Sequence, residues 1–549
     1  MTEYKPFGNQ NVLAYILADL NKRVKRDIST KIACLCVGVS AYIDPMNLFL
    51  KGESSVGKSY NVVQALKYYF PNFDLHFLAG LSPKALVHLP GVIFDGEGKE
   101  FDTEDKPEKP RKKDYENECD YKKAQEEYKE KSREYKDRLR KSYKLIDLSN
   151  KILVFLDAPE LETLNILKPL LSHDDDEIEY TFTDKTSGGQ LRSLRVVLRG
   201  HPAAIFLTVD KKYVEEFSTR SFTITPESDA EKYKEANKLT IWKKAYPWKK
   251  LEESKEAQKI REWILFIRSI FKEKKLNVAI PFLTVDELYP HEMARDMRDF
   301  THLTEFIESI AALNMCQRVF LETAGKFNLL VSAEDLKAAF IIFSNIFETT
   351  RTGTDQKILD FYHKCVNNDE GDITVHQFTT SYNIKHPDKK PLSEYTIRQY
   401  LNRLHQLSYV DKRTNPNDRR EVFYEPLVKE PDKLLENTLN FENKIDFLTF
   451  LEKGFEKWRT GICKEDKFYK TKENSAGDGF ELEETTIEEA KTRILCINNE
   501  DFYKYLSKPK KIEKSENKAE NTLKEENKTI SNNSSDDFWR NITESLEDL

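Results

Sequence analysis

The sequence predicts an α/β fold built on a parallel sheet, and three features of the chain lead to this prediction. Short apolar segments that resemble strands alternate with segments of helical periodicity between residues 46 and 227. One apolar run, residues 152–156, ends in the carboxylate Asp157, as is typical of an interior parallel strand. A glycine-rich turn at residues 52–59 joins an earlier strand to a helix.

Composition sets limits on the class of protein. The 549 residues correspond to three or four domains by length, and 39% hydrophobic residues are enough for real cores. The 87 Lys and Arg against 94 Asp and Glu exclude a uniformly basic nucleic-acid binder, so any such contact requires local basic patches. We expect no membrane span and no signal peptide. Seven scattered cysteines fit a cytoplasmic location, and Cys34 and Cys36 are expected to be buried thiols.

The first part of the chain is expected to be helical and then to enter the sheet. Residues 1–45 form an N-terminal helical segment, followed by a strand at Asn47–Lys51 and another at Asp74–Leu78. Residues 96–142 interrupt this pattern, because thirty of these 47 residues are charged, fifteen of each sign. Glutamate and lysine at helical spacing predict a solvated helix laced with salt bridges, a surface excursion rather than a binding arm.

After Asp157 the sequence predicts a hairpin, another strand and three further regions. Ile178–Thr183 and Leu194–Leu198 flank a polar turn and form the hairpin, and Ala203–Thr208 is the next strand. With the sheet domain ending at residue 227, we expect a helical region at 228–350, a winged helix at 352–428, a mostly helical accessory region at 429–505 and a disordered tail at 506–549. The winged helix is inferred from three helices followed by a two-stranded wing. The tip of the tail regains hydrophobic spacing, which suits a protein partner or a helical end.

Residues 52–59 have the spacing G-x-x-x-x-G-K-S of a phosphate-binding loop, with an apolar strand before it and an amphipathic helix after it. The glycines let backbone N–H groups surround phosphate oxygens, and the helix that begins near Lys58 adds its positive dipole end. Lys58 is expected to contact the β- and γ-phosphates, and the Ser59 hydroxyl to ligate Mg²⁺. The predicted ATP-binding residues are Gly52, Glu53, Ser54, Ser55, Val56, Gly57, Lys58, Ser59 and Tyr60.

Acidic and polar side chains follow the other predicted strands. Asp157 would hold Mg²⁺ directly or through water. A glutamate stands three positions later, so either Glu160 polarises the attacking water or Asp157 is itself the base and hydrolysis is slow; a helix-capping acid is the structural alternative. Thr208 could orient the water. Arg220 could enter a neighbouring subunit's nucleotide site and stabilise the transferring charge, although solvated arginines are common.

The order of these features resembles that of AAA+ ATPases. The hairpin between Asp157 and Thr208 is similar to that of the pre-sensor-1 hairpin branch, which includes minichromosome maintenance helicases and the helicase part of primase-helicases from mobile elements. Residues 164–173, 199–208 and 295–300 look like the latter group, and the resemblance covers about residues 45–428. It implies a homo-oligomeric ring, with residues 228–350 as the helical lid.

The resemblance also implies residue roles. By it, Gly52, Gly57, Lys58 and Ser59 match the Walker A positions, Asp157 Walker B, Thr208 sensor 1, Arg220 the arginine finger, and Arg295 or Arg298 sensor 2. The charged insert and the lack of a glutamate directly after Asp157 depart from the family pattern. The second departure puts the rate of hydrolysis in question.

Two basic regions are candidates for DNA contacts. In this family the hairpin points into the pore of the ring, where Lys185 and Arg192 would follow the DNA backbone; Arg195 and Arg199 could instead face a nucleotide or a subunit. Residues 385–420 hold nine Lys and Arg against four Asp and Glu. Their predicted contacts are Arg398 and Arg403 on the recognition helix and Lys412, Arg413, Arg419 and Arg420 on the wing. Solvated charges, or a winged helix that binds protein, are the alternatives.

These patterns lead to one principal function and two alternatives. The principal one is an oligomeric, ATP- and Mg²⁺-dependent motor that binds single-stranded or duplex DNA, a replicative-type helicase or translocase of a mobile element. The first alternative is an ATP-switched origin-binding initiator or helicase loader. The second is a signalling or defence ATPase whose winged helix and tail bind proteins. The hairpin favours the motor, whereas the lack of a glutamate directly after Asp157 and the long tail favour the alternatives.

Overall fold

A computed structural model describes residues 11–497 apart from short gaps. The undescribed residues within that range are 53–55, 80–90, 102–105, 116, 158, 160–167, 172–174, 185–191, 209–220, 229, 249–253, 290–293, 353–355, 367–372, 387–390, 407–408, 415–421, 427–443 and 474–479. Side chains are described for most of the remaining residues. The tail predicted at 506–549 therefore lies outside the described residues.

A parallel five-stranded sheet forms the centre of the molecule, with the strand order β2-β5-β8-β1-β9. Its strands are β1 (Asn47–Lys51), β2 (Leu75–Leu78), β5 (Ile152–Phe155), β8 (Ala203–Thr208) and β9 (Phe222–Ile224). Every pairing between neighbouring strands is parallel. The prediction of an α/β fold with a parallel sheet is thus confirmed, and β5 occupies the interior position that its apolar run indicates.

Helices cover one face of this sheet. α2 (Ile28–Ser40) packs on β1 and β8, and α10 (Ala333–Thr352) packs on β9; α1 (Val12–Arg23), α3 (Lys58–Leu66) and α9 (Ala294–Leu313) pack beside them. Alternate strand residues such as Leu48, Val154 and Ile205 contribute to the core on this side. α2 is buried from Thr30 to Ser40, and burial raises the pKa of the Cys34 and Cys36 thiols there.

A smaller four-stranded sheet packs against the other face, with the order β3-β4-β7-β6. Its strands are β3 (Val92–Phe94), β4 (Tyr143–Asp147), β6 (Glu177–Asp184) and β7 (Arg192–Arg199). The stacked rings of Phe49, Phe155 and Phe206 lie in the core between the two sheets. β6 and β7 form the expected hairpin, whose turn lies outside the described residues. The pairing of β4 with β7 was not expected, and it attaches the charged insert to this hairpin.

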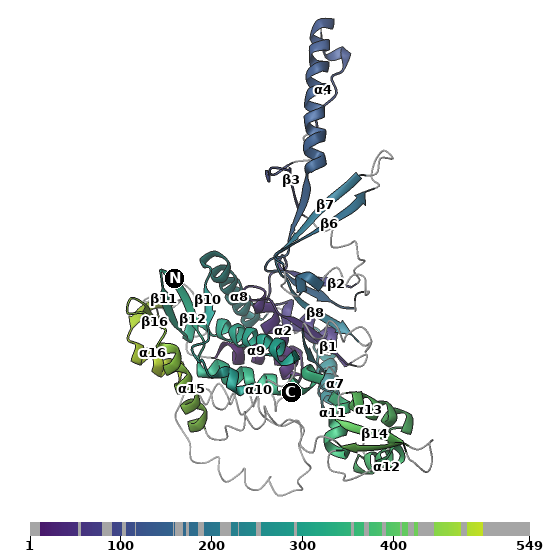
Figure 1. The fold of residues 1–549 in the computed structure, drawn as a ribbon, viewed down its shortest axis with the longest axis vertical. Helices are drawn as coiled ribbons and strands as arrows, with labels where there is room; N and C mark the ends of the chain where they lie inside the picture. Colours follow the sequence, from purple (N-terminus) through teal and green to yellow (C-terminus); the bar gives the residue numbers. More distant parts are fainter. Residues whose placement is uncertain are drawn as a thin grey trace.

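The charged insert contains α4 (Glu118–Lys141), a 24-residue helix that projects far from the body of the molecule (Figure 1). A short 3-10 helix, Lys112–Asp114, precedes it. The helix was expected, but the expectation that salt bridges lace it is wrong. In this fully described helix, no ion pair joins two of its own side chains. Opposite charges do stand at i and i+4, as in Lys122 with Glu126 and Arg133 with Asp137, but an exposed ion pair gains little over the solvation of each charge.

Residues 228–350 contain strands as well as the expected helices. The helices are α7 (Ala230–Ala245), α8 (Lys255–Lys274), α9 and α10 (Ala333–Thr352), with 3-10 turns at Val285–Leu288 and Met315–Gln317. The strands are β10 (Asn277–Ala279), β11 (Val319–Thr323) and β12 (Lys326–Leu330). β11 and β12 are joined by Ala324 and Gly325, which both have positive φ, as a tight hairpin turn requires.

The region after residue 429 joins this same sheet, so it is less helical than expected. It contributes α15 (Lys444–Arg459), β16 (Lys467–Glu473), β17 (Phe480–Thr485) and α16 (Ile487–Ile494). β16 pairs with β11, which gives the sheet order β10-β12-β11-β16-β17. Together, β16 and β17 carry lysine or glutamate at most positions, which weakens the apolar signal of a strand in the sequence.

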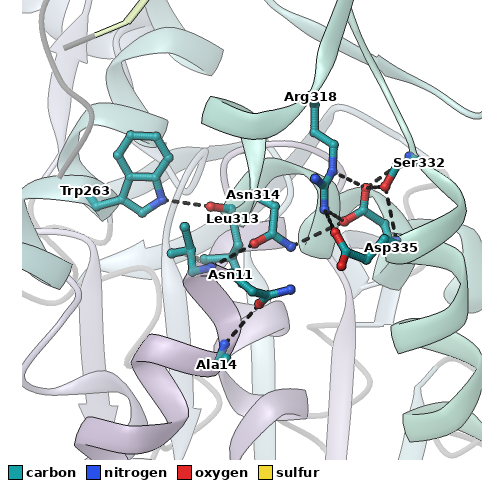
Figure 2. Close-up of polar contacts among 10 residues, drawn as sticks. Asn11, Ala14, Trp263, Leu313, Asn314, Arg318, Ser332 and Asp335 are labelled. Atoms are coloured by element: carbon teal, nitrogen blue, oxygen red, sulfur yellow. Dashed lines mark hydrogen bonds and ion pairs between the residues drawn. The ribbon is translucent and has the colours of Figure 1, made fainter. Parts of the chain in front are cut away.

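A buried polar network joins the start of α1 to α9 and α10 (Figure 2). Arg318 donates to both carboxylate oxygens of Asp335, at 2.7 and 2.6 Å. Asn314 donates to Asp335 and accepts the backbone N–H of Val12 at 3.1 Å. Because each polar group here is buried and paired, the network fixes the start of α1 against the end of α9 and the start of α10.

Residues 356–426 have a hydrophobic core of their own. Their elements are α11 (Gln356–Phe361), a π-helical turn (Tyr362–Val366), β13 (Ile373–Thr374), α12 (Val375–Lys385), α13 (Glu394–Gln406), β14 (Val410–Thr414) and β15 (Val422–Pro426). The strand order is β13-β15-β14. This unit lies to one side of the parallel sheet in Figure 1. Among the described helices, none combines the length and apolarity needed to cross a membrane.

Candidate nucleotide site

The glycine-rich loop joins the end of β1 to the start of α3. Gly57 is the N-cap residue of α3 and has a φ of 89°, a conformation that side chains disfavour. Residues Glu53, Ser54 and Ser55 lie outside the described residues. On both sides of that gap the backbone follows the strand–turn–helix context that the motif requires.

Lys58 turns its side chain back into the loop. Its Nζ donates to the Gly52 carbonyl oxygen at 2.6 Å, and only 9% of the residue is exposed. A lysine held across the mouth of the loop can exchange this carbonyl for a phosphate oxygen. Ser59 is exposed on the first turn of α3, and next to it the Tyr60 hydroxyl donates to the Arg23 carbonyl at 3.1 Å. The Lys58 ammonium thus lies in the loop, and Ser59 is exposed on the first turn of the helix that the loop precedes.

A buried charged network supports the loop from behind. Asp27, which is fully buried, accepts Asn61 Nδ2 at 2.6 Å and the Glu227 backbone N–H at 2.7 Å. Lys232 pairs with Asp27 at 2.5 Å and donates to the Val56 carbonyl at 2.9 Å. Sequence analysis missed these residues, because no motif connects three positions so far apart in the chain.

The register of the sheet places Thr208, and the strand that leads to Asp157, near the loop. In the register of the parallel strands, Lys51 lies beside Thr208, and Phe155 lies beside Phe206. Asp157, two residues after Phe155, therefore follows its strand toward the edge that carries Thr208, and it is exposed. With strands about 5 Å apart, β1 and the Asp157 strand are separated by about 10 Å. The side chain of Thr208, and Glu160 and Arg220 as a whole, lie outside the described residues.

The donor set at this edge suits Mg²⁺. A hydroxyl from Ser59 and a carboxylate from Asp157 are hard oxygen ligands, and both side chains are exposed. Among the described residues, no cluster of three or more His, Cys, Asp and Glu could hold a metal ion. Two protein ligands are enough where phosphate and water oxygens complete the octahedron, as is usual for Mg²⁺ bound with a nucleotide.

The two candidate sensor 2 arginines lie at the start of α9. Arg298 is exposed, and the side chain of Arg295 lies outside the described residues. Further along α9, the Glu305 and Glu308 carboxylates interact with Asp44, which precedes β1, whereas the phosphate loop follows β1. The assignment of either arginine to the nucleotide remains a prediction.

Comparisons with known proteins leave the family open. No family model matches the chain, and no curated protein is similar to it. A protein of Cytophaga hutchinsonii that is provisionally named an ATPase aligns with 64% of this chain and 92% of its own, at 12% identity and a TM-score of 0.26. The Orc1 protein of Aeropyrum pernix, solved in complex with DNA, aligns with 78% of this chain and 94% of its own, at 12% identity and a TM-score of 0.19. Similarities this low carry no argument about function.

The hairpin presents less free positive charge than the sequence indicates. Arg195 pairs with Glu179 through two contacts of 2.8 Å, and Arg199 pairs with Glu177 at 2.6 Å. The Arg195 guanidinium accordingly holds the pKa of Glu179 below its usual range. Lys185 and the side chain of Arg192, the two predicted DNA contacts, lie outside the described residues.

The basic residues after residue 390 differ in whether a carboxylate neutralises them. Arg398 is exposed on α13, and Lys412 reaches across from β14 to donate to Asn402 of α13 at 2.9 Å. Arg413 instead pairs with Asp411 at 2.8 Å and Glu425 at 2.9 Å. Arg403 is half-buried, and Arg419 and Arg420 lie outside the described residues. Tyr395, 72% exposed on α13, was missed, because a single tyrosine gives no sequence signal of exposure.

Proposed function

We propose that the chain is an AAA+ ATPase that assembles into a ring, binds DNA and uses ATP hydrolysis to unwind or translocate it, as a replicative-type helicase of a mobile element. One observation carries the proposal: Lys58 Nζ lies 2.6 Å from the Gly52 carbonyl oxygen in the loop between β1 and α3. Asp157 follows β5, which ends at the same edge of the sheet as β1.

Each residue has a physical task in this proposal. Backbone N–H groups of the loop and Lys58 bind the phosphates, and Ser59 and Asp157 hold Mg²⁺, which supplies charge neutralisation at the phosphates. Glu160 or Asp157 accepts the proton of the attacking water, and Thr208 orients that water. Arg220 of a neighbouring copy stabilises the charge on the transferred phosphoryl group.

The DNA-binding part of the proposal concerns two elements. We take residues 352–428 as a winged helix, with α13 as its recognition helix and β14 and β15 as its wing. The contact of Lys412 with Asn402 supports this, because it makes one continuous polar surface of helix and wing beside Arg398. The hairpin, through Lys185 and Arg192, follows the DNA backbone in the pore.

Replacement of Lys58 tests the proposal. Lys58→Ala should lower the ATPase rate by about 100-fold or more, because one preorganised charge at a developing anion is worth that much. It should also abolish ATP-dependent strand separation. The matched control is Lys67→Ala, an exposed lysine just after α3, which should leave both activities unchanged.

The same assays discriminate between the alternatives. ATP-dependent DNA binding without strand separation would indicate an initiator or helicase loader, for which a slow ATPase is sufficient. No DNA affinity at moderate salt would indicate a signalling or defence ATPase. An absence of Mg²⁺-dependent ATP binding to the wild-type protein would refute the proposal as a whole.

A further inference from the structure

The projecting helix α4 leaves two of its faces exposed. A third face packs on the chain that leads into it: Tyr121 contacts the ring of Tyr115, with centroids 5.9 Å apart, and Tyr135 contacts Phe101 at 5.5 Å. Arg138 on the same helix pairs with Asp95 at 2.8 Å. α4 and the segment before it thus form a small hairpin, and only its remaining faces are open to a partner.

The first open face is a basic stripe. Five exposed cations follow one another at intervals of seven, four, three and four positions, which keeps them on one side of a helix. We call this the basic stripe: Lys122, Lys129, Arg133, Lys136 and Arg140. It spans about five turns of the helix, or roughly 27 Å.

The second open face is an acidic stripe directly beside the first. Its four exposed carboxylates follow at intervals of four, four and three positions. We define this acidic stripe as Glu126, Glu130, Glu134 and Asp137. Over the middle of α4 the two stripes run side by side, at matching spacing along the helix.

Within each stripe, like charges are neighbours. Pairs such as Lys129 with Arg133, or Glu126 with Glu130, place like charges at i and i+4, which destabilises a helix by a few tenths of a kcal/mol each. A solvated helix gains from alternating signs, yet no residue of either stripe forms an ion pair in the described structure. Opposite charges of the two stripes also stand within reach of each other, as Arg133 and Asp137 do at i and i+4, but within one copy these exposed side chains remain solvated and available to a partner helix.

We propose that the two stripes pair α4 with α4 of a second copy of this chain, the two helices lying parallel, with the basic stripe of one against the acidic stripe of the next. Parallel helices bring opposite stripes together, whereas antiparallel helices would bring like stripes together. Copies that are related by rotation about an axis parallel to α4 present parallel helices, as in a ring. This inference therefore deepens the proposed function and rests on its ring assembly.

A nucleic acid is the less favoured occupant. The acidic stripe lies against the basic stripe along its middle and would repel a phosphate backbone that followed it. A second copy neutralises both stripes at once. Pairing of α4 would also constrain the hairpin of β6 and β7, because β4 begins two residues after α4 ends and pairs with β7.

Charge reversal tests this pairing. One variant reverses the basic stripe (Lys129→Glu, Arg133→Glu, Lys136→Glu and Arg140→Glu), and a second reverses the acidic stripe (Glu126→Lys, Glu130→Lys, Glu134→Lys and Asp137→Lys). Oligomer mass is measured by sedimentation at low salt with a slowly hydrolysed ATP analogue. Each variant alone should have an apparent dissociation constant at least about tenfold higher than the wild type, since several exposed ion pairs are lost. An equimolar mixture of the two variants should recover most of this loss.

Controls separate pairing from unfolding, charge and nucleotide binding. A matched variant reverses four exposed lysines elsewhere, Lys326, Lys453, Lys464 and Lys472, and should keep the wild-type mass. Circular dichroism reports separately on helix content, because Glu and Lys have similar helix propensity but each reversal adds like-charge neighbours along α4. Unchanged mass in both reversal variants would overturn the proposal, and so would a loss of DNA affinity from the basic-stripe variant at wild-type mass. ATP affinity, measured on the same samples, reports separately on the proposed function.

Discussion

At the scale of single residues, the phosphate loop depends on a buried ion pair outside the motif. Lys232 joins the loop carbonyl of Val56 to the buried carboxylate of Asp27. Lys232→Met would leave Asp27 buried without its cation, so we expect a loss of about 3–5 kcal/mol in the free energy of unfolding. ATP affinity should fall as well, because the loop loses its support.

A second variant makes this prediction specific. Asp27→Asn combined with Lys232→Met removes both charges and should be more stable than Lys232→Met alone. Lys234→Met, an exposed lysine on the same helix, is the control and should be neutral. Urea unfolding gives the comparison; a double variant no more stable than the single one would contradict it.

Gly200, between the hairpin and β8, is a position where only glycine fits. Its φ is 81°, and an added Cβ would lie 2.1 Å from Ser149 Oγ and 2.9 Å from the Ser149 backbone nitrogen. Gly98 has a φ of 78° with no atom within 4 Å of its Cβ position, so it serves as a matched control.

Comparison of these two glycines isolates the effect of the clash. Gly98→Ala should lower the free energy of unfolding by about 1–2 kcal/mol, the cost of a left-handed conformation. Gly200→Ala should cost more, because Ser149 must also move. Equal losses in thermal unfolding would show that the contact with Ser149 is not limiting.

At the scale of elements, α9 carries a carboxylate that titrates near neutral pH. Burial, with Asp44 and Glu305 nearby, raises the pKa of Glu308 from 4.5 to about 8. Between these two pH values the folded chain holds a proton that the unfolded chain has lost, so the free energy of unfolding falls as the pH rises. His302, hydrogen-bonded to Glu305 at 3.0 Å, belongs to the same cluster.

Replacing Glu308 by glutamine should remove most of this dependence. From pH 5 to pH 8.5 we expect the wild type to lose on the order of 4 kcal/mol more stability than Glu308→Gln. Glu273→Gln, an exposed glutamate on α8, should behave like the wild type. Denaturant unfolding at several pH values measures the difference, and parallel curves for wild type and Glu308→Gln would disprove the assignment.

Elements were predictable from sequence where burial imposed a regular pattern. β1, β5 and β8 are interior parallel strands with apolar residues on both faces, so their runs stand out. β16 and β17 expose one face and carry lysine and glutamate, so their pattern is weak. The ion pairs expected along α4 were wrong for another reason: Lys122 and Glu126, or Arg133 and Asp137, stand at i and i+4, but spacing alone does not show whether exposed side chains pair or stay solvated.

At the scale of the whole molecule, the candidate site combines local and distant signals. The strand–turn–helix context of the loop was predictable, because it lies in one continuous segment, and the strand that Asp157 follows was predictable from its apolar run. Asp27 and Lys232 were not, since the fold alone brings α2 and α7 to the same loop. Motifs thus locate the candidate chemistry, whereas the residues that hold it in place require the structure.

The salt dependence of DNA affinity, measured on the whole molecule, should show which basic residues contact phosphate. Each phosphate contact contributes about one unit to the slope of log affinity against log salt. Arg398→Ala should reduce this slope by about one, because Arg398 is exposed on α13. Arg413→Ala should change it far less, since Asp411 and Glu425 already neutralise Arg413. Fluorescence anisotropy with short duplex and single-stranded DNA over a salt series measures both, and equal slopes for the two variants would argue against α13 as the recognition helix.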